Sequence, residues 1–417
     1  MSTTLQTKTI SRSTIFYGWW IVVGCLLVAV VGWSLTVFGM GVYIHVLSER
    51  PGFSISLIST AVTMSYLVSA VCLISVGTAT ARLGPKPVLA AGSIILGAAV
   101  PALAYCEQAW QVFLVFAAMG LGRSCLSTTS ISTTLAPWFE RHQGRAVSMA
   151  LLGASIGGMI GTPLLLGGIA VFGEQTALVL AGASSLLVVL PVVVFVLKRT
   201  PQEIGLLPDG ETSSSSSALK AEVSWSRKGA MATRQFYSQL IAFSLSLMVQ
   251  IGFLSHHVSL VAPTLGDHGA SVAVSSAALA AFVGRIALAR FADRIDLRLT
   301  TGGVLLVAAA SLAAMAGTSS PEGLLLTSVC YGLTIGNLTT LSPIIVRREF
   351  GAASFGAVYG VAASVIAIAT AFGPGLFGIL RDAFNSYGPA LIIAALMNFV
   401  AAITIVWGGR RPLPSPS

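Results

Sequence analysis

The sequence predicts an all-α membrane protein with twelve transmembrane helices in two pseudo-symmetric six-helix bundles. Three observations support this prediction: twelve long apolar segments, a strong bias of Lys and Arg to alternate loops, and one polar stretch that divides the segments six and six. The chain is 55% hydrophobic and only 9% charged, whereas a soluble domain carries about 25% charged residues. This composition excludes an ordinary soluble fold.

Each apolar segment approaches or exceeds the roughly 20 residues that a spanning helix needs. Backbone polar groups must pair internally in lipid, so the segments are predicted to be helices. All 14 acidic residues fall at segment ends or in connecting loops. The predicted helices cover residues 17–43, 55–79, 87–105, 109–136, 144–171, 177–198, 236–262, 271–292, 300–318, 322–346, 352–379 and 388–408.

Orientation follows from the Lys and Arg residues of short loops, which concentrate on the cytoplasmic side. The side opposite to the N-terminus holds only Arg50 and Arg381. The sequence therefore predicts a multi-pass protein of the plasma (inner) membrane with both termini in the cytoplasm. The net charge of +9 is spread over many loops, which argues against nucleic-acid binding. The first apolar stretch is too long for a cleaved signal peptide, so a retained helix is expected.

The polar stretch 199–234, which includes the serine run Ser213 to Ser217, sets the predicted domain boundaries. We expect an N-terminal bundle over 1–198, a cytoplasmic linker over 199–234 and a C-terminal bundle over 235–417. The basic loops 77–86 and 289–298 occupy equivalent places in the two halves. Two such halves with a substrate site between them near the midplane form a known transporter plan.

Several motifs carry a resemblance over essentially the whole chain. Asp293, Arg294 and Arg298 fit a Gly-x-x-x-Asp-Arg-x-Gly-x-Arg loop pattern, and the copy at 77–86 is degenerate, with Ala81 in the aspartate position. Further motifs lie at 16–20, 137–146, 200–210, 350–356 and 373–387. Together they resemble the major facilitator superfamily, and within it the monocarboxylate-porter branch that includes the oxalate/formate exchangers. The resemblance implies the major facilitator fold and secondary transport of organic carboxylates.

Two cations, Arg123 and Arg285, sit deep inside apolar segments. A charge at bilayer depth is costly, so it normally faces a buried partner or a water-filled cavity. The resemblance implies that Arg285, eight residues before Asp293, binds the substrate carboxylate, and a guanidinium fork fits a carboxylate in two bonds. A second cation at Arg123 would suit a dicarboxylate. The structural alternatives are contacts of either arginine with helix carbonyls or water.

Other polar residues of the apolar segments are weaker candidates for substrate contact. His256 and His257 are adjacent, so they point about 100° apart and cannot both face a cavity. One of the two, with His257 as the candidate, could bond the substrate or carry a proton, because imidazole titrates near neutral pH; a bond to backbone is the alternative. Tyr331, Asn337 and Tyr359 are further candidates, although most tyrosines of helix bundles serve packing. Tyr43, Tyr66 and Gln250 rank below them.

The cytoplasmic loops supply candidate gating residues. The resemblance implies that Asp293 and Arg294, with Arg298 and Arg82, hold the two halves together on the cytoplasmic side. Small residues on one helix face allow close helix packing. The stripe Gly153, Gly157 and Gly161 therefore predicts either close contacts inside the bundle or dimerisation, and Gly356 with Gly360 repeats the pattern. Gly373-Pro374-Gly375 is predicted to bend its helix.

The leading hypothesis is a secondary active transporter of small monocarboxylates or dicarboxylates, including aromatic acids. It would work by alternating access, as a proton symporter or an anion exchanger. The alternative is a drug or metabolite efflux carrier of the same fold, which a lack of intramembrane acids makes less favoured. No nucleophile–base pair, metal-ligand spacing or phosphate loop is visible, so no enzyme activity and no cofactor or metal is expected. The expected partners are a small organic anion, a proton and the lipid bilayer, and the expected state is a monomer.

Overall fold

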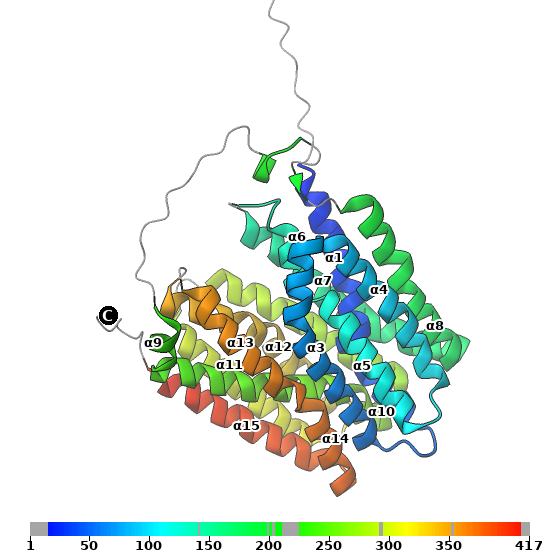
Figure 1. The fold of residues 1–417 in the computed structure, drawn as a ribbon. Helices are drawn as coiled ribbons and strands as arrows, with labels where there is room; N and C mark the ends of the chain where they lie inside the picture. The colour runs from blue at the N-terminus through cyan, green and yellow to red at the C-terminus, as the bar shows by residue number, and fades with distance from the viewer. Residues whose placement is uncertain are drawn as a thin grey trace, which may run out of the picture.

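The computed structural model describes residues 16–140, 142–197, 200–201, 205–210, 225–291, 295–351 and 354–409, and it is all-helical over these ranges (Figure 1). The N-terminal half contains the helices α1 (Gly18–Trp33), η1 (Ser34–Phe38), α2 (Gly39–Ser48), α3 (Ile55–Leu83), α4 (Pro85–Ala102), η2 (Leu103–Tyr105), α5 (Ala109–Cys125), α6 (Thr128–Leu135), α7 (Gln143–Phe172), α8 (Glu174–Ser184), η3 (Ser185–Val189) and η4 (Val192–Val196). After η6 (Pro208–Gly210) and α9 (Arg227–Met231), the C-terminal half contains α10 (Arg234–Phe291), α11 (Leu297–Ala316), α12 (Pro321–Phe350), α13 (Phe355–Ala371), α14 (Gly373–Phe384) and α15 (Gly388–Trp407).

The described residues form 11 helical segments that are long and apolar enough to cross a membrane. One of them, Arg234–Leu288, has 55 residues, which is enough for two crossings. It is interrupted at Gly266, whose φ of 67° and ψ of 174° are non-helical. Glycine reaches positive φ without steric cost, so the chain reverses there between the predicted helices 236–262 and 271–292. The predicted crossings are therefore all present.

Local sequence signals explain where several helices begin. The side chains of Ser54 and Ser320 accept bonds from Leu57 N and Gly323 N at 3.2 and 3.1 Å, and such caps satisfy amides that a helix start leaves free. Asp296 caps α11 in the same way. The predicted bend at Gly373-Pro374-Gly375 is confirmed, because α13 ends at Ala371 and α14 begins at Gly373.

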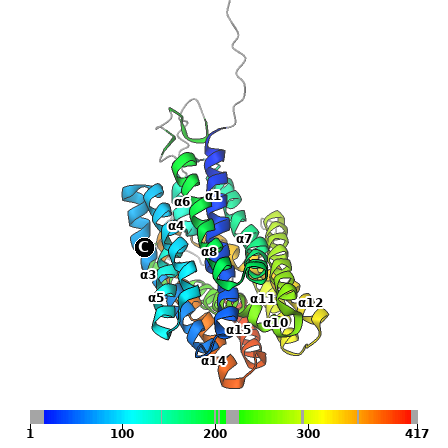
Figure 2. The same ribbon diagram turned by 90° about the vertical axis from the view of Figure 1, so that its right-hand side faces the viewer.

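The two halves meet at one end of the molecule and spread apart at the other. In Figure 1 the helices of the two halves run at an angle to each other and approach near α14, whereas the ends beside α6, α9 and the start of α1 lie apart. We call the end beside α6, α9 and the start of α1 the linker end, and the end near α14 the distal end. In the view turned by 90°, α14 again lies at the end of the molecule where α3 and α5 begin (Figure 2). Across the halves, α3 packs on α13 and α14, and α10 packs on α2 and α7.

Hydrogen bonds tie the halves together toward the distal end. The backbone N–H of Gly375 donates to Thr63 Oγ1 at 2.9 Å, and the hydroxyl of Ser275 donates to Met159 O at 2.9 Å. In each pair the two residues belong to different halves. His45 Nε2 lies 3.2 Å from Asp267 Oδ1. These contacts close the distal end in this conformation.

The glycine stripe of α7 packs inside the N-terminal half, against α1. A Cβ at Gly153 would lie 2.3 Å from Leu26 O, and one at Gly157 would lie 2.6 Å from Val30 O. Of the two uses predicted for this stripe, the structure assigns close packing within the bundle. Gly356 and Gly360 make no such close contact within the bundle in this conformation, because a Cβ at either position meets open space.

Candidate functional site

An apolar cavity of about 190 Å³ lies between the two halves. Helices of both halves build its wall, with α1, η1, α5 and α7 on one side and α10, α12 and α13 on the other. The wall consists of Trp33, Val37, Phe38, Arg123, Ala154, Ser155, Leu247, Gln250, Ile251, Leu254, Val274, Ala277, Ala278, Ala281, Arg285, Ile335, Thr339 and Thr370. A site at the interface of two repeats matches the transporter plan expected from the sequence.

Arg123 reaches the cavity from α5, in the N-terminal half. Its guanidinium carbon lies 3.8 Å from the centroid of the Tyr66 ring, which α3 supplies. A guanidinium over an aromatic face is attracted by the ring quadrupole. Neighbouring Gly120 lets α5 approach α3 closely, since a Cβ there would lie 2.2 Å from Ser65 O. Close packing of these helices thus brings the Arg123 head group onto the Tyr66 ring.

Arg285 reaches the same cavity from α10, in the C-terminal half. Here α10 packs tightly on α12: a Cβ at Gly336 would lie 2.3 Å from Ala281 O and 3.3 Å from the Arg285 Cβ. A Cβ at Gly284 would likewise lie 2.4 Å from Leu333 O. The backbone of α12 therefore fixes the position from which the Arg285 side chain extends.

The charge of the cavity wall is uncompensated. Within the described parts of the chain, Arg285 Nε is buried without a hydrogen-bond partner, and neither arginine has a carboxylate at ion-pair distance. Among the described lining residues there is no Asp, Glu, Lys or His. A buried charge is costly unless it is paired, so the wall is suited to an anionic ligand.

Of the weaker candidates, Gln250 lines this cavity, whereas His257, Tyr331, Asn337 and Tyr359 lie outside its lining. His257 is fully buried, with Nε2 at 2.9 Å from Ser328 Oγ and its ring 4.5 Å from that of Phe253. Tyr331 packs on the same Phe253 ring at 4.5 Å. Asn337 Nδ2 donates to Leu333 O at 3.0 Å. The ring of Tyr359 stacks on that of Phe355, 5.1 Å between centroids. In this conformation these four side chains therefore make hydrogen bonds and ring contacts outside the cavity lining.

His256, rather than His257, lies where the halves meet. Its Nε2 is 3.0 Å from Pro374 O and 3.2 Å from Ser59 Oγ of the other half. A carbonyl can only accept, so Nε2 carries the proton and Nδ1 accepts from Tyr387 Oη at 3.0 Å. Desolvation raises the pKa of Tyr387, which keeps its hydroxyl a donor. The neutral imidazole is therefore fully bonded at this contact.

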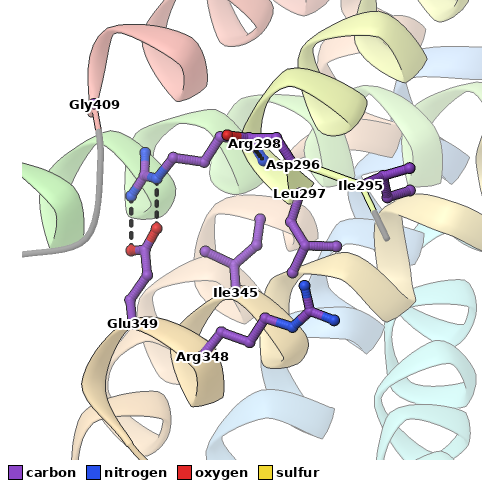
Figure 3. A pocket seen from close by; sticks show the side chains of 8 residues that line it. All are labelled: Ile295, Asp296, Leu297, Arg298, Ile345, Arg348, Glu349 and Gly409. Carbon is purple, nitrogen blue, oxygen red and sulfur yellow. Dashed lines mark hydrogen bonds and ion pairs between the residues drawn. The ribbon is translucent and has the colours of Figure 1, made fainter. Parts of the chain in front are cut away.

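The predicted gating residues are only partly within the described structure. Asp293 and Arg294 lie outside the described residues, and Arg82 lies in the last turn of α3 at the linker end. Arg298 binds Glu349 of α12 at 2.6 and 2.8 Å (Figure 3). It also donates to Ser238 Oγ, Gln235 O and Ile405 O. All of these partners belong to the C-terminal half, so Arg298 joins α10, α11, α12 and α15.

A hollow of about 470 Å³ lies beside the Arg298–Glu349 pair at the linker end. Its lining comes from the start of α11, the end of α12 and the segment after α15 (Figure 3). Acids and bases both line it, with Asp296 and Glu349 beside Arg298 and Arg348. It lies within one half and its charges are mixed, so we favour the cavity between the halves as the substrate site.

Sequence reasoning found both cavity arginines but missed most of the wall. Trp33, Phe38, Ser155, Thr339 and Thr370 carry no local signal that separates them from lipid-facing or packing residues. The distal contacts of Ser59 and Thr63 were also missed, since they depend on which helices meet across the halves.

Comparisons with known proteins agree with this architecture. The profile of the Major Facilitator Superfamily matches residues 22–374 and 258–417. Monocarboxylate transporter 13 of Bos taurus is 24% identical over 333 residues, 76% of this chain and 72% of the relative. MFS-type transporter pynF of Aspergillus niger is 25% identical over 196 residues, covering 46% and 44% of the two chains.

Among solved structures, a bacterial homologue of the human lysosomal transporter Spinster, in an inward-facing and unoccupied conformation, has a TM-score of 0.71 at 15% identity. The match covers 96% of this chain and 100% of that one. The family match extends over both halves and over the helices that build the central cavity. The chain therefore belongs to the Major Facilitator Superfamily and is a membrane transporter rather than an enzyme.

Proposed function

We propose that this transporter carries small organic carboxylates by alternating access, as a proton symporter or an anion exchanger. The observation that supports this most is the pair of guanidiniums, Arg123 and Arg285, in one cavity between the halves. Arginine is permanently charged and matches a carboxylate with two parallel bonds. The distant similarity to monocarboxylate transporter 13 points to the same substrate class.

Several further features belong to the proposal. The chain would act as a monomer in the plasma (inner) membrane with both termini in the cytoplasm, and residues 1–198 and 235–417 would be the two moving bodies joined by 199–234. Asp293, Arg294, Arg298 and Arg82 would form the cytoplasmic gate. Asp293→Asn should then alter the transport rate more than substrate affinity, and an effect on affinity alone would contradict that role.

Uptake into proteoliposomes tests the substrate class. Purified protein would be assayed with labelled lactate, pyruvate, formate, oxalate, succinate and benzoate, with and without an inward proton gradient. We expect saturable uptake of at least one acid and its loss in Arg285→Gln. Dependence on the proton gradient would indicate symport, and dependence on internal anion would indicate exchange. Arg145→Gln is the matched control, because Arg145 is an exposed arginine at the start of α7, 5.6 Å from the Trp19 ring centroid.

An efflux carrier for drugs or metabolites is the competing function. It would be favoured if the folded wild-type protein took up no acid of the panel, or if Arg285→Gln transported like the wild type. A cationic substrate usually needs an intramembrane acid, and no described residue of the cavity wall supplies one.

A further inference from the structure

The central cavity presents two permanent positive charges from opposite halves of the transporter, Arg123 from α5 and Arg285 from α10. A substrate with one carboxylate would neutralise one of these charges and leave the other unpaired in the same cavity. We propose that the substrate is a small dicarboxylate that binds one guanidinium with each carboxylate and so bridges the two halves. This inference rests on the proposed carboxylate transport and narrows it to dianions.

The Arg123 head group is already oriented for such a contact. Stacking on Tyr66 at 3.8 Å occupies one face of the planar guanidinium. Its N–H groups lie in the plane of the fork, so they stay available to a carboxylate approaching edge-on.

The rest of the wall fits a short apolar spacer. Apart from the two arginines it is built mainly from apolar side chains, among them Ile251, Leu254 and Ala278. Drug-sized ligands occupy pockets of about 300–1,000 Å³, so a cavity of about 190 Å³ fits a smaller molecule. Few hydroxyl or amide groups line it, so a hydroxyl-rich dianion such as a sugar phosphate would leave its polar groups unpaired.

Bridging would also connect binding to transport. The guanidiniums belong to halves that diverge toward the linker end (Figure 1), and two like charges resist being brought together. A dianion between them replaces repulsion by two attractions, so it favours closure of the halves around it. A ligand held by one half alone gives no such advantage.

Equilibrium binding to the purified full-length protein in nanodiscs would test the proposal. Isothermal titration calorimetry would measure the binding of malonate, succinate and glutarate, and of propionate, butyrate and valerate as their chain-matched monoacids. We expect one dicarboxylate length to bind at least about tenfold more tightly than its monoacid. In Arg123→Gln the affinity for that dicarboxylate should fall by about tenfold while the affinity for the monoacid stays unchanged, so the preference disappears.

Arg285→Gln should lower the affinity for both dicarboxylates and monoacids, and Arg145→Gln should change neither affinity. If Arg123→Gln does not fold, Arg123→Lys keeps the charge and should retain the dicarboxylate preference. Equal affinity for both classes in the wild type, or an equal loss of both in Arg123→Gln, would overturn the dianion inference while leaving carboxylate transport intact. Binding of neither class would overturn the proposed function itself. Tighter binding of a phosphate monoester than of any dicarboxylate would also overturn the inference.

Discussion

The backbone N–H of Ser56, in the first turn of α3, donates to Asp382 Oδ2 of α14 at 2.8 Å. This bond joins the two halves of the transporter at the distal end. A carboxylate is favoured at the N-terminus of a helix by the free amides and the helix dipole. Asp382 therefore stabilises the conformation in which the distal end is closed.

Removing this carboxylate should shift the transporter toward a conformation open at the distal end. A hydrogen bond to a charged group contributes about 1.5–3 kcal/mol, and each 1.4 kcal/mol is a factor of about ten. In a cysteine-free background with Ser155→Cys in the cavity, Asp382→Ala should speed labelling by an impermeant maleimide from the distal side by about tenfold or more. Glu322→Gln removes an exposed acid at the start of α12 and is the control; equal rates in both variants would show that Asp382 is not part of the closure.

The buried Arg298–Glu349 pair predicts a strong effect on stability. The two side chains are 8% and 7% exposed, and removing one partner of a buried pair costs about 3–5 kcal/mol because the other charge is left alone. Glu349→Gln and Arg298→Met should each lower the thermal unfolding temperature in detergent. The unfolding temperature of the double variant should be higher than that of either single variant. Arg347→Met, which replaces an exposed arginine of α12, should have little effect. Simple addition of the two losses would contradict this account.

Gly336 is predicted to position Arg285 through the packing of α10 on α12. An alanine Cβ would lie 2.3 Å from Ala281 O, a backbone atom that cannot move without separating the helices. Overpacking of this kind costs about 1–3 kcal/mol. Gly336→Ala should raise the KM for the transported acid by roughly tenfold with a smaller change in the maximal rate. Gly303→Ala, at a position where a Cβ meets open space, should transport like the wild type; an unchanged KM in Gly336→Ala would exclude the positioning role.

Asn398 is an unusual residue in the core. It is fully buried in α15, and neither atom of its amide group has a partner among the described residues. An unsatisfied buried polar group costs about 1–3 kcal/mol. Asn398→Leu should therefore raise the unfolding temperature without altering transport. A lower unfolding temperature would indicate that the amide finds a partner in another conformation, and a loss of transport would support a role in that conformation.

The predicted orientation can be tested with cysteines at the two ends of the molecule. Gln108 lies exposed in the loop before α5, and Gln143 lies exposed at the start of α7. Positive charge concentrates on the linker side, which should be cytoplasmic. In intact cells and a cysteine-free background, an impermeant maleimide should label Gln108→Cys and not Gln143→Cys. Labelling of Gln143→Cys alone would show that the orientation is opposite to the predicted one.

The sequence by itself determined the fold class, the helix positions and the two arginines. Apolar length decides what can cross a bilayer, because each spanning residue must satisfy its backbone locally within a helix. The reversal at Gly266 and the break at Gly373 also follow from local chemistry. Arg123 and Arg285 could be recognised because a charge in an apolar segment is expensive wherever the helix packs.

Only the tertiary structure decided which side chains share a space. Arg123 and Arg285 are far apart in the chain, and their common cavity depends on how the two halves place α5 and α10 around it. The tertiary structure also distinguishes His256 from His257. Both are buried, and only the packing of α3 and α14 gives His256 its contact across the halves. Periodicity cannot rank the faces of a helix that is apolar all round, so the cavity wall, the distal contacts and the close approach at Gly336 had to come from the fold.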